Sequence, residues 1–283
     1  MTPQILFQDS RNTSLTEPQP EEFHCEFSYK KGGTAIPSVE TLVFLVGALS
    51  QVAILEYQLP ISQYSFNDPG LTVLLRSSKA PDHDFYRAKH ILWSLRITAC
   101  YMFSKEHWGE IGFFSRYALP SSSPGQETPL RIQRTGIRSL WTNSNSPPKD
   151  PTFKPYDIFI TIINILVSEG ELDAEAPQGH LSGYNREADL SVGMECTSRA
   201  SVENFTNRIA VEAFTLLAEF LPTVEEKLRW KGVQFVVRNQ GKIVGRGIVR
   251  KGVIPRRGDG TFDVGWLDDG VEDGGLFESP QVS

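Results

Sequence analysis

Two segments of the chain carry apolar residues at nearly every position, without a polar face. They are residues 39–54 and residues 156–167, the latter reading YDIFITIINILV. A helix that is apolar all round must be buried on most of its sides. The β-branched residues of the second segment would also suit a strand, and its analogy with the first segment favours a helix. We therefore predict two buried helices, the first with Ser38 as its N-cap.

Two other segments repeat apolar residues at steps of three and four, the pattern of an amphipathic helix. The first is Phe85, Ala88, Leu92, Leu95, Ala99 and Met102; the second is Val202, Phe205, Ile209, Ala213, Leu216 and Phe220, with Ser201 as its expected N-cap. Shorter alternating or β-branched runs predict strands at 23–31, 71–75, 111–117, 130–137, 190–196, 233–237 and 243–249. The turn 239–241 should join the last two strands, and 130–137 should return beside 111–117.

Short sequences recur at nearly one spacing. The motif W-x2-[IV]-x-F-x2-R starts at Trp108 and again at Trp230, 122 residues later. Ser-[Lys/Arg]-Ala occurs at 78 and 198, and prolines expected at helix starts lie at 37 and 155. We therefore predict an α+β fold built from an internally duplicated helix–strand–helix–strand–strand unit. It should have pseudo-two-fold symmetry, with its helices packed on an antiparallel or mixed sheet.

The predicted duplication divides the chain into five parts. They are a flexible N-terminal arm at 1–20, a first repeat at 21–141, a polar, proline-rich linker at 142–154, a second repeat at 155–251, and an acidic, glycine-rich tail at 252–283.

Composition argues against several classes of partner, location and cofactor. The net charge of −6 argues against a nucleic-acid partner and against an anionic membrane surface. No apolar run reaches the roughly 20 residues of a membrane helix, and no secretory leader is visible, so we expect a cytoplasmic protein. Three cysteines without CxxC spacing predict neither a disulfide framework nor a metal site. The nucleotide and nucleophile motifs are missing too, and we predict no cofactor.

Charge is unevenly placed near the C-terminal end. Residues 227–257 contain ten Lys or Arg and no acid, and residues 258–283 contain seven Asp or Glu and no base. The even spacing of Lys242, Arg246 and Arg250 favours one solvated strand face. Two alternatives stay open: the tail folds back on the basic segment, or that segment binds nucleic acid or an acidic partner. A solvated tail would add little to stability, so its deletion should change the melting temperature little.

Six residues are candidates for a functional role. The repeated Trp108, Trp230, Arg116 and Arg238 are most simply packing and strand-end residues. Alternatively, the two arginines face each other and hold an anionic ligand bidentately. His83 and His90 lie seven residues apart, which favours a solvated polar helix face over a metal or proton-transfer role.

The sequence favours a non-catalytic binding, assembly or accessory protein. Its partner would be a protein or a small hydrophobic or anionic ligand, bound at the seam between the two repeats around Arg116, Arg238, Trp108 and Trp230. The alternative is a cofactor-independent enzyme that acts on a hydrophobic small molecule in a pocket between the repeats. The oligomeric state stays open.

Overall fold

The protein forms two compact units of helices and antiparallel strands. A computed structural model describes residues 23–29, 35–68, 70–76, 86–106, 108, 111–116, 137–142, 152–197, 205–224, 226, 229–239 and 242–254. Of these, residues 23–116 and 162–174 make up one unit, which we call the N-terminal unit. Residues 137–161 and 175–254 make up the other, the C-terminal unit. The predicted α+β class is confirmed.

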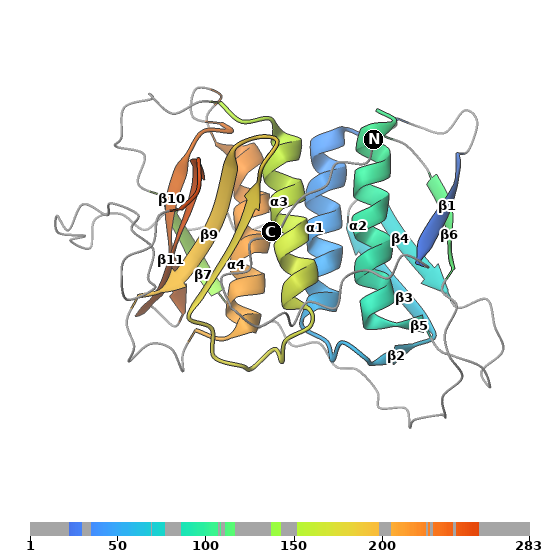
Figure 1. Cartoon of the computed structure of the whole chain (residues 1–283), viewed down its shortest axis with the longest axis horizontal. Helices are drawn as coiled ribbons and strands as arrows, with labels where there is room; N and C mark the ends of the chain where they lie inside the picture. The colour runs from blue at the N-terminus through green and yellow to red at the C-terminus, as the bar shows by residue number, and fades with distance from the viewer. Residues whose placement is uncertain are drawn as a thin grey trace. The chain divides into compact units, whose positions relative to one another are not determined.

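The N-terminal unit contains two long helices and three antiparallel strand pairs (Figure 1). Its elements are β1 (His24–Tyr29), α1 (Ser38–Ala53), β2 (Pro60–Ile61), β3 (Gln63–Asp68), β4 (Leu71–Arg76), β5 (Tyr86–Arg87), α2 (Ala88–Ser104) and β6 (Ile111–Arg116). The pairs are β1 with β6, β2 with β5 and β3 with β4. Helices α1 and α2 pack on each other.

Helix α1 is buried on most sides, as its apolar composition predicts. The β3–β4 hairpin covers part of it, because the Phe66 ring lies over Gly47 and 5.0 Å from the Phe44 ring. The Tyr64 hydroxyl donates a hydrogen bond of 2.7 Å to the Ala48 carbonyl. The hairpin is thereby fixed to the middle of the helix.

The C-terminal unit is built on a five-stranded antiparallel sheet. Its elements are β7 (Ile137–Thr142), α3 (Pro155–Glu169), β8 (His180–Asn185), β9 (Leu190–Cys196), α4 (Asn207–Phe220), a short 3-10 helix (Leu221–Thr223), β10 (Val233–Asn239) and β11 (Lys242–Lys251). The strand order is β7-β10-β11-β9-β8. Helix α4 lies against one face of this sheet (Figure 1). Helix α3 contributes residues to both units, and its predicted helical state is confirmed.

Two glycines of β11 let the sheet approach its own core. A Cβ on Gly247 would overlap the ring of Phe235, its direct partner on β10. A Cβ on Gly245 would lie 2.7 Å from the ring of Phe205, the residue two positions before α4. Both phenylalanines are fully buried. We call the face that carries Gly245, Gly247 and Phe235 the inner face of the sheet.

Two local predictions are wrong. Ser38 is the first residue of α1 rather than its N-cap; Pro37 takes the cap position, and no side chain caps this helix end. Helix α4 starts at Asn207 after Thr206, several residues beyond the expected cap at Ser201, which lies outside the described residues. The strand predicted at 130–137 lies outside the described residues except for Ile137, which begins β7; β7 pairs with β10, and β6 pairs with β1. Pairing partners distant in the chain leave no trace in a local pattern.

Apart from the two-residue strands β2 and β5, residues 24–116 follow the order strand, helix, hairpin, helix, strand; residues 137–251 follow the same order and end with the additional strand β11. The predicted strands 71–75 and 190–196 correspond to β4 and β9, so the predicted unit lacked the first strand of each hairpin, β3 and β8, whereas the predicted strand 23–31 before the first helix corresponds to β1. The arm 1–20, residues 143–151 of the predicted linker and the tail beyond 254 lie outside the described residues. Within the described ranges, no helix is long and apolar enough to cross a bilayer.

Matching backbone hydrogen bonds occur in the two halves. The Trp108 carbonyl accepts the Ile36 N–H at 2.9 Å, just before α1. The Trp230 carbonyl accepts the Phe153 N–H at 2.7 Å, just before α3. Trp108 precedes β6 and Trp230 precedes β10, each by three residues. These backbone bonds therefore hold the residues before β6 next to the start of α1, and the residues before β10 next to the start of α3.

The second helix of each half also begins alike. The Ala88 N–H at the start of α2 donates to Leu59, and the Asn207 N–H at the start of α4 donates to Ala176, both at 3.0 Å. Leu59 and Ala176 are each followed by a proline, and this proline forms a β-bridge with the residue that precedes α2 or α4. These antiparallel pairs are Pro60 with Arg87 and Pro177 with Thr206.

Candidate binding surface

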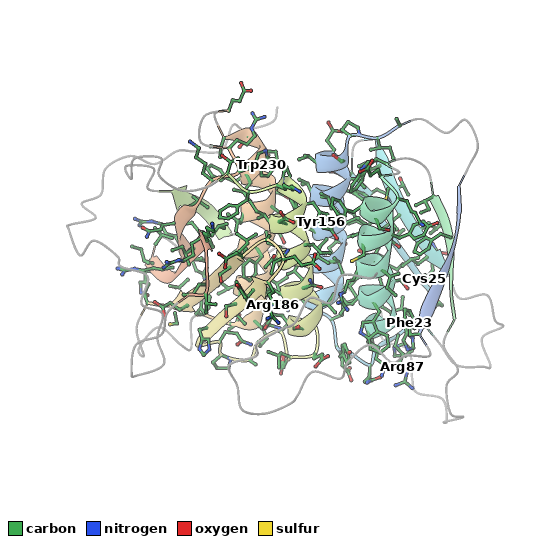
Figure 2. The ribbon with its side chains drawn as sticks, turned by 45° about the horizontal axis from the view of Figure 1, so that its top comes forward. Phe23, Cys25, Arg87, Tyr156, Arg186 and Trp230 are labelled. Atoms are coloured by element: carbon green, nitrogen blue, oxygen red, sulfur yellow. The ribbon has the colours of Figure 1, made fainter. Side chains whose placement is uncertain are left out.

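The two repeated tryptophans make packing contacts. Trp230 is half-buried, with a φ of 63° and its ring edge-on to Phe159 at a centroid distance of 5.9 Å (Figure 2). Trp108 is also half-buried. With their carbonyls bonded to the starts of α1 and α3, both residues fit the packing interpretation.

The two repeated arginines belong to different units. Arg116 ends β6 opposite His24, and its side chain lies outside the described part. Arg238 is half-buried on β10, opposite Ser139 of β7 and next to a register shift against β11. Their joint binding of an anion across the seam stays a prediction.

His90 lies in a buried aromatic cluster at the start of α2. Its side chain is 2% exposed, stacks on Phe23 at 5.8 Å and lies 5.6 Å from the Trp93 ring. Its Nδ1 accepts the Arg87 N–H at 3.1 Å, which satisfies one amide at the helix start. The prediction of a solvated polar face is therefore wrong for His90. His83 lies outside the described residues.

Burial controls the protonation of this cluster. It lowers the pKa of His90 to about 4, helped by the positive charges of Lys89 and Arg87. Burial also raises the pKa of the Cys25 thiol to about 11, although a hydrogen bond with Ser94 opposes this. At neutral pH the imidazole is thus uncharged and the thiol protonated, so both are poorly suited to acid–base or nucleophilic chemistry. Figure 2 shows Phe23, Cys25 and Arg87 at this edge of the N-terminal unit.

Lys89 completes the cluster as a buried cation over aromatic rings. It is 6% exposed, and its Nζ lies 5.7 Å from the Tyr57 ring centroid and 5.5 Å from the Trp93 ring centroid. Its backbone N–H donates to the Tyr57 carbonyl at 3.1 Å. The Tyr57 hydroxyl donates to Glu171 at 3.3 Å. Cation–π attraction and these bonds fix the start of α2 to the loop after α1.

The face of the five-stranded sheet opposite to Phe235 and α4 carries charged and polar side chains among apolar ones. We call it the outer face. Because side chains alternate along a strand, it carries His180, Ser182 and Tyr184 of β8, Ser191, Gly193 and Glu195 of β9, Arg246, Ile248 and Arg250 of β11, and Gln234, Val236 and Arg238 of β10. Arginines and apolar residues therefore alternate over its two central strands.

Cross-strand pairs set the order of groups on the outer face. Arg250 lies opposite Ser191, Ile248 opposite Gly193, and Arg246 between Glu195 and Val236. Arg246 and Arg250 are half-buried, whereas Ile248 and Val236 are each 5% exposed. The central strands thus present three arginines around apolar groups, with Glu195 as the acid among them. The register shift, which leaves Val244 of β11 without a partner on β10, places Lys242 opposite Asn239, outside this row.

The segment after β11 turns back over the outer face. Gly252 has a φ of 79°, which favours glycine, and its N–H donates to the Asp189 carbonyl at 2.7 Å. The Ser191 hydroxyl donates to the Gly252 carbonyl at 2.7 Å. Ile254 is 6% exposed and lies against Gly193, where a Cβ would be 2.8 Å from its Cδ1. No apolar pattern in the sequence indicated this return.

Metal ligands do not gather in the part of the chain that the structure describes. No three His, Cys, Asp or Glu side chains there lie close enough to hold a metal ion. The three cysteines are half-buried and form no disulfide. Comparison with known proteins found no family model, no curated protein and no solved structure that matches the chain.

Proposed function

We propose that the chain is a non-catalytic binding protein whose binding surface is the outer face of the five-stranded sheet. Its partner is an acidic protein segment. The observation that carries this proposal is the alternation of Arg238, Arg246 and Arg250 with the apolar Val236 and Ile248 on adjacent strands. Arginine is enriched at protein interfaces, and it pairs with carboxylates through two parallel hydrogen bonds.

The form of the sheet supports this role. One face is occupied by the core through Phe205 and Phe235, and the arginines of the other face, Arg238, Arg246 and Arg250, are half-buried. A rigid antiparallel sheet holds charged groups at fixed spacings, which limits the conformational entropy lost on binding. An acidic segment with interspersed apolar residues would match both kinds of group on this face.

The buried cluster in the N-terminal unit supports binding over catalysis. A perturbed pKa, such as that of His90, is often a sign of an active site. Here the imidazole is 2% exposed between Phe23 and Trp93, and its Nδ1 is engaged with the Arg87 amide. Its perturbed pKa follows from packing. A cofactor-independent enzyme with a pocket between the repeats stays the alternative hypothesis.

We also propose that the two halves are copies of one unit. The recurring strand–helix–hairpin–helix–strand order supports this, as do the backbone bonds of Trp108 and Trp230 and the bonds that begin α2 and α4. Strand pairing favours moving the boundary of the first repeat from 141 to before β7, which pairs with β10. Strand β11, with Arg246 and Arg250, has no counterpart among the described residues of the first half. The proposed binding surface would then be specific to the second copy.

Binding of an acidic probe peptide to the full chain tests this function. The probe is a labelled peptide rich in Asp and Glu with a few aromatic residues, followed by fluorescence anisotropy. Replacing both Arg246 and Arg250 by glutamine should weaken binding about tenfold or more, because two charge-assisted contacts are lost. High salt should weaken binding to the unmodified chain as well.

Two controls make this test specific. Arg186→Gln removes an exposed arginine from the turn between β8 and β9 and should leave the affinity unchanged. The same peptide with lysine in place of every acid should not bind. Equal loss of affinity in Arg186→Gln and in the double variant would refute the proposed surface, as would binding of the basic peptide.

A further inference from the structure

The described chain ends at Ile254 over the outer face, and the acidic part of the sequence begins at 258, after Pro255, Arg256 and Arg257. The Gly252 carbonyl is bonded to Ser191, and the Ile254 side chain lies at Gly193, two residues further along β9. The next outer-face position on β9 is Glu195, and Arg246 lies opposite it. A segment that continued on this course would reach Arg246.

We propose that residues 258–283, which we call the acidic tail, bind the outer face of their own chain and compete there with the acidic partner. This inference rests on the proposed function, because it states how binding of the partner to the outer face would be regulated. The tail carries seven acids and no base, and apolar residues are interspersed among them. The larger of these apolar residues are Phe262, Trp266, Leu267, Leu276 and Phe277. The tail therefore has the composition proposed for the partner itself.

The acidic tail is long enough to reach the outer face, and it is covalently attached close to it. Strands lie about 4.8 Å apart, so the step from β9 across β11 to β10 spans only about 10 Å. A chain extends by up to about 3.3 Å per residue, so the residues that follow Ile254 can reach Arg246 and Arg238 with many to spare. A tethered segment is present at an effective concentration of about millimolar, so weak contacts suffice to keep it bound.

An apolar contact fixes the last described residue, Ile254, on the outer face. Ile254 already covers Gly193, next to Ile248. Val236 and Ile248 are as deeply buried as residues of a core, each at 5% exposure. Charge attraction alone would be screened within about 10 Å at 0.1 M salt.

The test is a competition measured on the full chain. The probe is a labelled peptide with the sequence of residues 258–283, added to the unmodified chain and to two variants. The first variant changes all seven acids of the tail to the corresponding amides. The second is Ile254→Ser, which removes the apolar contact with Gly193. Both variants should bind the peptide about tenfold more tightly than the unmodified chain, because the intramolecular competitor is weakened.

A matched control replaces acids outside the tail. Glu40→Gln and Glu56→Gln neutralise exposed acids of the N-terminal unit and should leave peptide affinity at the value of the unmodified chain. Adding Arg246→Gln and Arg250→Gln to the neutralised chain should abolish the gain. A gain that survives these changes would overturn the inference, because the tail would then act elsewhere.

The remaining outcomes separate this inference from the proposed function. Equal binding of the peptide to the unmodified chain and to both variants overturns the tail inference and leaves the binding surface standing. No binding to any form, together with failure of the acidic probe above, overturns the proposed function. Competition that grows with protein concentration would show a tail bound to a second copy, which also contradicts the intramolecular contact.

Discussion

Replacing Gly247 by valine should lower the free energy of unfolding by about 3 kcal/mol, the upper part of the range for overpacked cores. A side chain at this position would overlap the ring of Phe235. That ring is fully buried on the inner face, so it can move only by displacing other core side chains. Chemical denaturation should show a lower midpoint with an unchanged slope, since the loss lies in the folded state.

Two comparisons isolate this clash from the general cost of changing a glycine. Gly179→Ala adds a methyl group where no atom lies within 4 Å, so it should change stability by less than about 0.5 kcal/mol. Combining Gly247→Val with Phe235→Leu should cost less than the sum of the two single changes. A fully additive double variant would mean that Gly247 is not required for contact with Phe235.

Acidification should destabilise the N-terminal unit through His90. The pKa of His90 is about 4 in the folded state, against 6.5 for an unperturbed histidine. Above pH 6.5 the group is neutral in both states and does not affect stability. Between pH 6.5 and 4 only the unfolded state takes up the proton, so stability falls with falling pH. At about 1.4 kcal/mol per pH unit, the total loss reaches up to about 3 kcal/mol.

Comparison with His90→Gln separates this effect from the titration of carboxylates. The amide keeps a polar side chain near the Arg87 N–H and does not titrate. The variant should be less stable at pH 7 because packing against Phe23 and Trp93 is lost. The stability difference between the two proteins should then shrink as pH falls from 6.5 to 4. Parallel stability curves over this range would mean that His90 titrates normally in the folded protein.

Much of the secondary structure could be predicted from the sequence, because the apolar pattern records burial. The buried helices α1 and α3 follow from runs with no polar face, and α2 follows from its periodicity. Strands β3 and β8 were missed because their sequences, QYSFND and HLSGYN, are largely polar. Their strand state depends on pairing with β4 and β9, which propensity does not encode.

The candidate surface was partly visible in the sequence. The even spacing of Arg246 and Arg250 correctly indicated one strand face. Lys242 shares that spacing, yet the register shift near Arg238 removes it from the row, and a bulge leaves no signal in composition. The burial of His90 could not be predicted either, since it depends on Phe23, a residue far away in the chain.

Side-chain NMR of the full chain tests the proposed binding surface most directly. The Nε–Hε resonances of arginines are followed while the acidic probe peptide is added to the chain with the neutralised tail. The resonances of Arg246 and Arg250 should shift, and those of Arg186 and Arg208 should stay in place. Shifts confined to Arg186, Arg208 or the Lys89 and His90 cluster, or no shift at saturating peptide, would contradict the outer face as the binding surface.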